Sequence, residues 1–139
     1  MKARTHSLVV GTRGKGTYEI TPEVARFVRD SGVITGTVTV FVQHTSASLI
    51  IYENADPSAR TDLHEFFERL VPEDQEYFVH TDEGSDDMPA HIRTILTGAS
   101  VAVPVTDGLL ALGTWQGLYL IEHRDRPHRR ELILHVAGC

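Results

Sequence analysis

Cysteine and long apolar runs are almost absent from this sequence of 139 residues. The single cysteine, Cys139, excludes an internal disulfide and is typical of proteins from a reducing compartment. No apolar run reaches the roughly 18 residues that a membrane-spanning helix needs, and the first residues lack the apolar core of a signal peptide. We therefore expect a cytoplasmic protein with no membrane partner.

Positive charge is also scarce, because 13 Lys and Arg residues stand against 19 Asp and Glu residues, which gives a net charge of −6. Proteins that bind nucleic acid or membrane surfaces generally carry basic patches, so we expect no nucleic-acid partner. The only basic run, residues 124–130, holds four of the 13 basic side chains. We expect it to be a solvated turn between strands, although it is also the natural place for an anion.

No internal repeat, low-complexity tract or linker divides the chain. A chain of this length buries about two thirds of the surface that its unfolded form exposes, which is enough for one sizeable core. The sequence therefore predicts a single domain over residues 1–139.

Runs of alternating or continuous apolar residues, rich in β-branched side chains, predict eight strands. Gly11–Gly16 is expected to form a hairpin turn between the first two strands, and Asp107–Gly108 another hairpin turn. Strands and helices do not alternate regularly, which favours antiparallel pairing. The strands are expected at residues 4–10, 17–20, 35–43, 49–52, 101–105, 109–112, 118–123 and 132–136.

Three helices are expected, each with a proline in its first turn. Thr21 and Asp56 are the predicted N-caps of the first two, and Pro89 is expected to open the third. The expected fold is α+β, with mostly antiparallel, β-sandwich-like sheets and the three short helices packed outside. The predicted buried faces are Val24, Phe27 and Val28, then Leu63, Phe66, Phe67 and Leu70, then Ile92, Ile95 and Leu96.

The segment His80–His91 is the most chemically loaded part of the chain. It holds two imidazoles and four carboxylates within twelve residues, and it shows no apolar periodicity before the third helix. A loop with this many ligand groups and a histidine at each end suits a metal site or an acid–base site. The plainer alternative is a solvated acidic loop whose Asp and Ser side chains cap a helix.

The same segment resembles the signature loop of the YjbQ-type family, described as secondary thiamine-phosphate synthases. The resemblance rests on residues spread from the first helix to the last strand, in the order and at the spacing of that family. Besides His80…Glu83–Gly84…Asp86–Asp87–Met88–Pro89–Ala90–His91–Ile92, the matching stretches are His44–Leu49, Glu53–Pro57, Leu112–Gly117 and Glu122–Arg124.

The resemblance implies a compact α+β protein that assembles as a homotrimer, with a histidine-lined metal site. The activity it implies is weak formation of thiamine phosphate from a pyrimidine pyrophosphate and a thiazole phosphate. On this basis the predicted site has His80, His91 and His123 as metal ligands, His44, Glu83, Asp86 and Asp87 as catalytic residues, and Thr45, Ser46, Gln116 and Arg124 as substrate- or anion-binding residues.

The cofactor expected at this site is a divalent metal. Three neutral imidazoles with one open position suit zinc, and bound water then reaches a pKa of about 7. If the metal is magnesium, Glu83, Asp86 and Asp87 are the better ligands, since magnesium prefers oxygen. Displacement of pyrophosphate requires positive charge on the leaving group, which a metal together with Arg124 could supply.

Two other functions stay open at this point. The same site could use a metal-bound hydroxide to hydrolyse a phosphate ester, or the protein could be a non-catalytic trimer that binds a metal or an anion. Trp115, flanked by Gly113 and Gly117, is expected to be a core or interface anchor. Glu122 and His123 are adjacent in a predicted strand, so they should face opposite ways and not share a site.

Overall fold

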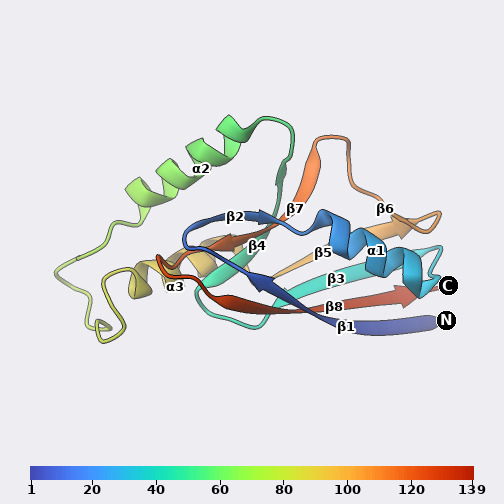
Figure 1. Cartoon of the computed structure of the whole chain (residues 1–139), viewed down its shortest axis with the longest axis horizontal. Coiled ribbons are helices and arrows are strands. Elements are labelled where there is room, and N and C mark those ends of the chain that lie inside the picture. The colour runs from blue at the N-terminus through green and yellow to red at the C-terminus, as the bar shows by residue number, and fades with distance from the viewer.

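The computed structural model describes all 139 residues, which form eight strands and three helices (Figure 1). Their order along the chain is the predicted one. The elements are β1 (Lys2–Gly11), β2 (Gly16–Glu19), α1 (Thr21–Ser31), β3 (Gly36–Val42), β4 (Ala47–Glu53), α2 (Pro57–Leu70), α3 (Asp87–Thr97), β5 (Ser100–Thr106), β6 (Leu109–Leu110), β7 (Gln116–Glu122) and β8 (Arg129–Gly138).

The strands form a five-stranded sheet, in the order β1-β8-β3-β5-β6, and a three-stranded sheet, in the order β2-β7-β4. Every pairing is antiparallel. The two sheets share one core, to which β3, β7 and β8 contribute alternate residues, and β7 is buried on its other face as well. The predicted α+β fold with antiparallel sheets is therefore confirmed, and both chain termini lie at the same end of the molecule (Figure 1).

The predicted hairpin between the first two strands is wrong. Strand β1 pairs with β8 and β2 pairs with β7, so Gly11–Gly16 carries the chain from one sheet to the other. Gly14 has a φ of 111°, and a Cβ there would lie 2.6 Å from the carbonyl oxygen of Asp125. Gly14 thus allows two loops to cross closely. Sequence spacing alone does not distinguish such a crossing from a hairpin turn. The predicted turn at Asp107–Gly108 does join two paired strands.

Helix α1 packs on the core through Val24 and Val28, and Gly32 ends it with a left-handed φ of 74°. Thr21 is not the N-cap but the first helical residue. Its hydroxyl accepts a hydrogen bond from the backbone N–H of Leu118 in β7, at 2.9 Å. The Thr21 side chain is therefore engaged in a tertiary contact with β7 and does not cap the helix.

Helix α2 begins as predicted, since the Asp56 carboxylate accepts a hydrogen bond from Ser58 N at 2.9 Å. Its predicted buried face is wrong, however. Only Phe67 is buried, whereas the side chains of Phe66 and Leu70 are 57% and 52% exposed. The helix projects from the body of the molecule and uses only part of its apolar stripe (Figure 1).

Helix α3 also turns a different face inward from the one predicted. Ile95 and Leu96 are exposed, while Ala90, Arg93 and Thr94 are buried. The buried Arg93 donates a hydrogen bond to the carbonyl oxygen of Val71 at 2.8 Å, and this polar contact helps to fix the rotation of the helix. No helix in the structure has the length and apolar character needed to cross a membrane.

Candidate metal centre

Three side chains converge where the acidic loop becomes α3. Asp87 is the first residue of the helix, and His91, four residues later, lies on the same helix face. His80 approaches from the start of the loop. The Nε2 atoms of His80 and His91 lie 2.9 Å and 3.2 Å from Oδ2 of Asp87, and potential ligand atoms of all three residues lie within 4.8 Å of one another.

A hydrogen bond on its other ring nitrogen fixes the tautomer of neutral His91. Its Nδ1 lies 2.8 Å from the carbonyl oxygen of Thr45, which can only accept, so Nδ1 carries the proton. Nε2 of the neutral ring is then unprotonated, and it lies 3.2 Å from the carboxylate oxygen Oδ2 of Asp87. Two electron-rich atoms at this distance need a cation between them, either a second proton on His91 or a metal ion.

Arg124 holds the carboxylates of the loop in place. Its Nε donates to Asp86 at 2.9 Å, its Nη1 to Oδ1 of Asp87 at 2.8 Å, and its Nη2 to the carbonyl oxygen of Glu83 at 2.8 Å. The second Asp87 oxygen is thereby left to face the two histidines. Orientation of a ligand by a neighbouring hydrogen bond is the usual support of a protein metal site.

The same contacts keep Asp86 ionised. Burial by itself opposes the charged form, but the hydrogen bonds from Arg124 and from the backbone N–H of Asp125 outweigh it and hold the pKa of Asp86 below its ordinary value. The Arg124 pKa is raised in return, because hydrogen bonding and attraction to Asp86 exceed the effect of desolvation. Asp86 therefore acts with Arg124 to position the loop. Its carboxylate is engaged there and does not cap the helix.

A cleft of about 710 Å³ opens beside these groups. One part of its wall is polar and carries the two histidines of the cluster, and the other part is apolar and comes from α3 and the residues that follow it. A volume of this size is typical of sites for small molecules. The lining residues are His44, Thr45, His80, Met88, His91, Thr94, Ile95, Gly98 and Ala99.

His44 lines the cleft as a neutral imidazole. Its Nε2 accepts a hydrogen bond from the backbone N–H of Glu131 at 2.8 Å, so the proton sits on Nδ1. Burial first, and then the positive charge of Arg130 nearby, lower the pKa of His44. Its Nδ1 faces Nη1 of Arg130 at 3.4 Å, so both ring nitrogens lie against groups of the protein and the ring is not available to bind a metal through Nε2.

His123, predicted as a metal ligand, does not join the cluster. It is buried, its Nε2 pairs with Oγ of Ser48 at 2.8 Å, and its ring packs edge-on against Phe67. Burial, followed by the positive charge of Arg93, lowers the pKa of His123 to about 3. The expectation that Glu122 and His123 face different surroundings holds, since Glu122 pairs with Arg130.

Four further predicted site residues serve the scaffold. The Gln116 side chain accepts a hydrogen bond from Gly113 N at 2.8 Å and shapes its own loop. Ser46 is buried and accepts a hydrogen bond from Arg130, and the Glu83 side chain is exposed. Arg124, predicted to bind an anion, spends its donors within the protein.

The basic run contains two of the most enclosed charges in the protein. Arg130 pairs with Glu122, both buried, and Thr12 also donates to Glu122 at 2.7 Å. We expected this run to be solvated, and for Arg124 and Arg130 that is wrong. A charge run usually faces solvent, so only the partners brought close by folding, Glu122 for Arg130 and the two aspartates for Arg124, distinguish these arginines from their exposed neighbours.

The donor set of the cluster fits a divalent transition metal. Two imidazole nitrogens and one carboxylate oxygen leave further coordination positions open toward the cleft, as catalytic metal sites do. The fixed Nδ1–H of His91 and the anchored carboxylate of Asp87 supply the outer support.

Comparison with known proteins agrees with the motifs of the sequence. The family model described as UPF0047 protein YjbQ-like matches residues 6–139. The chain is 56% identical over 131 residues to UPF0047 protein sll1880 of Synechocystis sp., which covers 94% of this chain and 89% of that one. It is 38% identical over 133 residues to UPF0047 protein YjbQ of Escherichia coli O157:H7, which covers 95% of this chain and 96% of that one.

Solved structures share the fold. The hypothetical protein APE1520 from Aeropyrum pernix K1 superposes with a TM-score of 0.88 at 30% identity, which covers 98% of this chain and 99% of that one. An uncharacterised YjbQ/UPF0047 protein from Clostridium acetobutylicum gives a TM-score of 0.84 at 34% identity, with 96% and 99% coverage. The chain belongs to the YjbQ-like UPF0047 protein family.

Proposed function

We propose that this protein is a metal-dependent enzyme that acts on a small phosphorylated substrate at the cleft beside His80, Asp87 and His91. The observation that carries the proposal is the approach of two imidazole nitrogens to one carboxylate oxygen, with the proton of neutral His91 held on the far side of its ring. Zinc fits this mixed nitrogen and oxygen set. Magnesium fits it less well, because magnesium favours oxygen ligands.

A metal held here would supply positive charge to the leaving phosphate oxygens. The chain's own residues have separate tasks. Arg124 positions Asp86 and Asp87 and uses three of its five N–H donors for contacts within the protein. The apolar wall formed by Met88 and Ile95 offers a surface for a heteroaromatic ring, and the ring of His44 lines the same cleft.

Transfer of thiamine-phosphate type is the reaction we favour, on the strength of the family resemblance. In that reaction the thiazole nitrogen bonds to the methylene carbon of the pyrimidine substrate as the bond to pyrophosphate breaks. The reaction needs no strong base, which agrees with a cleft whose His44 is held neutral with its Nε2 lone pair already engaged.

Hydrolysis of a phosphate ester is the second candidate. The observation that favours it is the openness of the centre at His80, whose side chain is 53% exposed to water. A transferase has to exclude water from an activated substrate, and this chain alone does not enclose the cleft.

The experiment that tests the proposal is turnover of a pyrimidine pyrophosphate by the zinc-loaded protein, with and without thiazole phosphate. Thiamine phosphate formed only when both are present supports the transferase. Pyrophosphate released without the second substrate indicates hydrolysis. Saturable binding of the pyrophosphate compound with no product would indicate a binding protein, and neither binding nor product would overturn the proposed function.

A homotrimer is part of the proposal. Exposed apolar side chains lie on α2, on α3 and in the loop before β7, and their burial would favour association. Trp115 is 66% exposed, so it is not a core residue, and Asn54 clamps its loop with hydrogen bonds to Thr114 and Gln116. A partner seated against Ile95 would also narrow the open cleft beside His80.

A further inference from the structure

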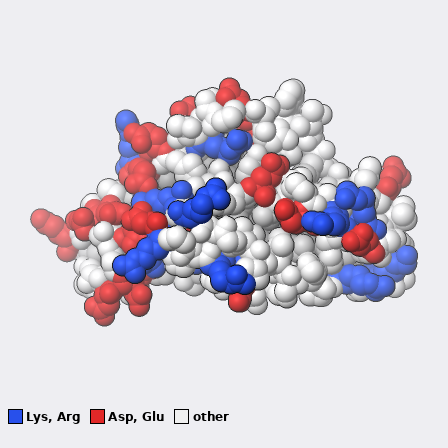
Figure 2. Space-filling view, in the orientation of Figure 1, with Lys and Arg blue, Asp and Glu red and all other residues white.

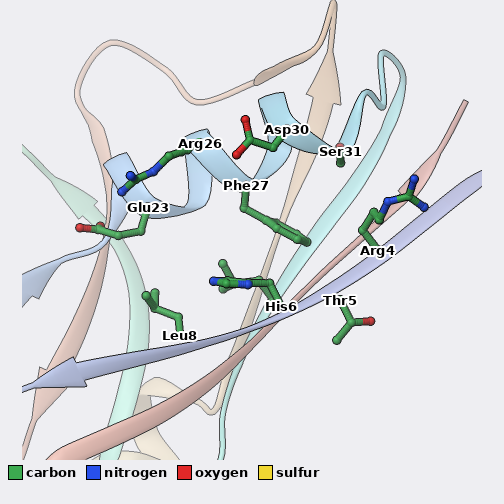
Figure 3. A pocket seen from close by; sticks show the side chains of 10 residues that line it. Arg4, Thr5, His6, Leu8, Glu23, Arg26, Phe27, Asp30 and Ser31 are labelled. Atoms are coloured by element: carbon green, nitrogen blue, oxygen red, sulfur yellow. The ribbon is translucent and has the colours of Figure 1, made fainter.

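A second cleft, of about 520 Å³, lies between α1 and β1 (Figure 3). No residue lines both this cleft and the one beside the metal centre. Alternate residues of β1 face the helix here, and Phe27 reaches down from α1 toward them (Figure 3). The cleft is lined by charged side chains, among them Arg4, Glu23, Arg26 and Asp30, and by His6 and Phe27.

Four charged side chains line this cleft, two of each sign: Arg4, Glu23, Arg26 and Asp30. None of them forms an ion pair with any other side chain of the protein. By contrast, the charges around Arg124 are paired. The second cleft is therefore formally neutral but holds free charges of both signs.

The carboxylate of Glu23 lacks hydrogen-bond donors. One carboxylate oxygen of Glu23, Oε2, is buried from solvent and has no hydrogen-bond donor. A buried acceptor without a partner is costly, and natural proteins rarely leave one. No group of the protein donates to the other carboxylate oxygen, Oε1, either, and Oε1 is not among the buried atoms, so a ligand can reach it.

The middle of the cleft is apolar and flat. The rings of His6 and Phe27 stack with centroids 5.9 Å apart and an angle of 25° between their planes. Leu8 and Leu134 extend this surface. In Figure 3, Glu23 lies at one end of the stack and Arg4 at the other.

We propose that this cleft binds an elongated zwitterion, of the class of short peptides with free termini. Its cationic nitrogen donates to Glu23, its carboxylate pairs with Arg4, and an apolar or aromatic body lies against His6 and Phe27. A ligand with one charge only would leave either the acid or the base of the cleft unmatched.

The cleft runs along α1 from Glu23 to Asp30 and along β1 from Arg4 to Leu8, a length of about 10–13 Å. An extended tripeptide has a comparable length of about 10 Å. A tripeptide is therefore a suitable probe, and a free amino acid is shorter than the cleft.

The test is calorimetric titration of the metal-stripped full-length protein with the tripeptide Gly-Phe-Gly. We expect saturable binding that weakens tenfold or more when the N-terminus is acetylated or the C-terminus is amidated, because each change removes a charge-assisted hydrogen bond. Glu23→Gln should weaken binding of the free tripeptide, and acetylation of the peptide N-terminus should then have no further effect. Arg4→Gln should likewise weaken binding, and amidation of the peptide C-terminus should then have no further effect.

Matched controls are Glu76→Gln and Arg29→Gln, which remove the same charges from exposed residues outside the cleft. Both should bind the tripeptide as the wild type does, and circular dichroism should show all four variants folded. Absence of binding at millimolar peptide, or binding that ignores the blocked termini, would overturn the proposal. Since no metal is present, this outcome is independent of the turnover experiment.

Discussion

Two histidines of this chain show how strongly surroundings decide chemistry. His91 donates a hydrogen bond from Nδ1 to a carbonyl oxygen and has a carboxylate oxygen beside Nε2, at the edge of an open cleft. His123 is enclosed with Ser48 and Phe67, and burial keeps it neutral far below its ordinary pKa. The first is placed to hold a cation, and the second contributes to the core.

The depressed pKa of His123 predicts an acid-labile fold. The unfolded imidazole takes up a proton below its ordinary pKa of 6.5, whereas the folded one does so only at about 3. Stability from this residue is therefore complete above pH 6.5 and is lost as the pH falls between these values. His123→Gln can still hydrogen-bond to Ser48 but does not titrate.

Urea unfolding at a series of pH values checks this. Between pH 6 and pH 4 the free energy of unfolding of the wild type should fall about 1.4 kcal/mol per pH unit more steeply than that of His123→Gln. Parallel slopes for the two proteins would show that His123 does not titrate in this way. The carboxyl of Asp86 does not interfere, because its folded pKa is below that of an ordinary aspartate and its effect belongs to lower pH.

Arg124 is predicted to matter for stability as well as for the site. Arg124→Ala leaves the buried carboxylates of Asp86 and Asp87 without their partner, and loss of one member of a buried ion pair typically costs about 3–5 kcal/mol. Urea denaturation measures this loss. Arg129→Ala, an exposed neighbour with no partner, should change stability by less than about 0.5 kcal/mol. A similarly small effect for Arg124→Ala would refute the positioning role.

At the scale of elements, local signals predicted the order of helices and strands, and contacts between elements decided the rest. The Asp56 cap and the Gly32 terminus could be predicted because a cap needs only its own turn. The inward face of α3 could not, because Arg93 and the anchored Asp87 fix its rotation through partners distant in sequence. The separation of β1 from β2 likewise depends on a loop crossing.

Helix α2 provides a sharp comparison between neighbouring phenylalanines. Phe67→Ala should lower the free energy of unfolding by about 3–5 kcal/mol, since it leaves a cavity beside His123. Phe66→Ala should cost well under 1 kcal/mol in a dilute monomer. Thermal unfolding at two protein concentrations measures both. If Phe66→Ala is as damaging as Phe67→Ala at every concentration, the helix packs differently from this description.

At the scale of the whole molecule, charge is distributed unevenly. Acidic side chains gather at the end that carries the loop between α2 and α3 (Figure 2). The sequence located the candidate site here because two histidines and several carboxylates lie in one segment, and Asp87 and His91 share a helix face. It could not exclude His123, Ser46 or Gln116, because pairing across the sheets and loops decides where those side chains point.

Assembly is predicted to depend on the exposed apolar side chains. In sedimentation at micromolar concentration the wild type should run as a trimer, Trp115→Ala should dissociate more readily and lose activity, and His91→Ala should remain trimeric. A wild type that runs as a monomer would refute the assembly proposal. Dissociation of His91→Ala would show that the histidine or its metal supports the fold or the assembly.

The measurement that tests the central claim most directly is a calorimetric titration of the chelator-stripped protein with zinc. The wild type should bind one zinc per chain, and Asp87→Asn and His91→Ala should each weaken that binding at least 100-fold. The controls Asp62→Asn and His135→Ala alter exposed residues of the same types and should bind as the wild type does. A wild type that binds no zinc at millimolar concentration, or ligand variants that bind it unchanged, would contradict a metal centre at His80, Asp87 and His91.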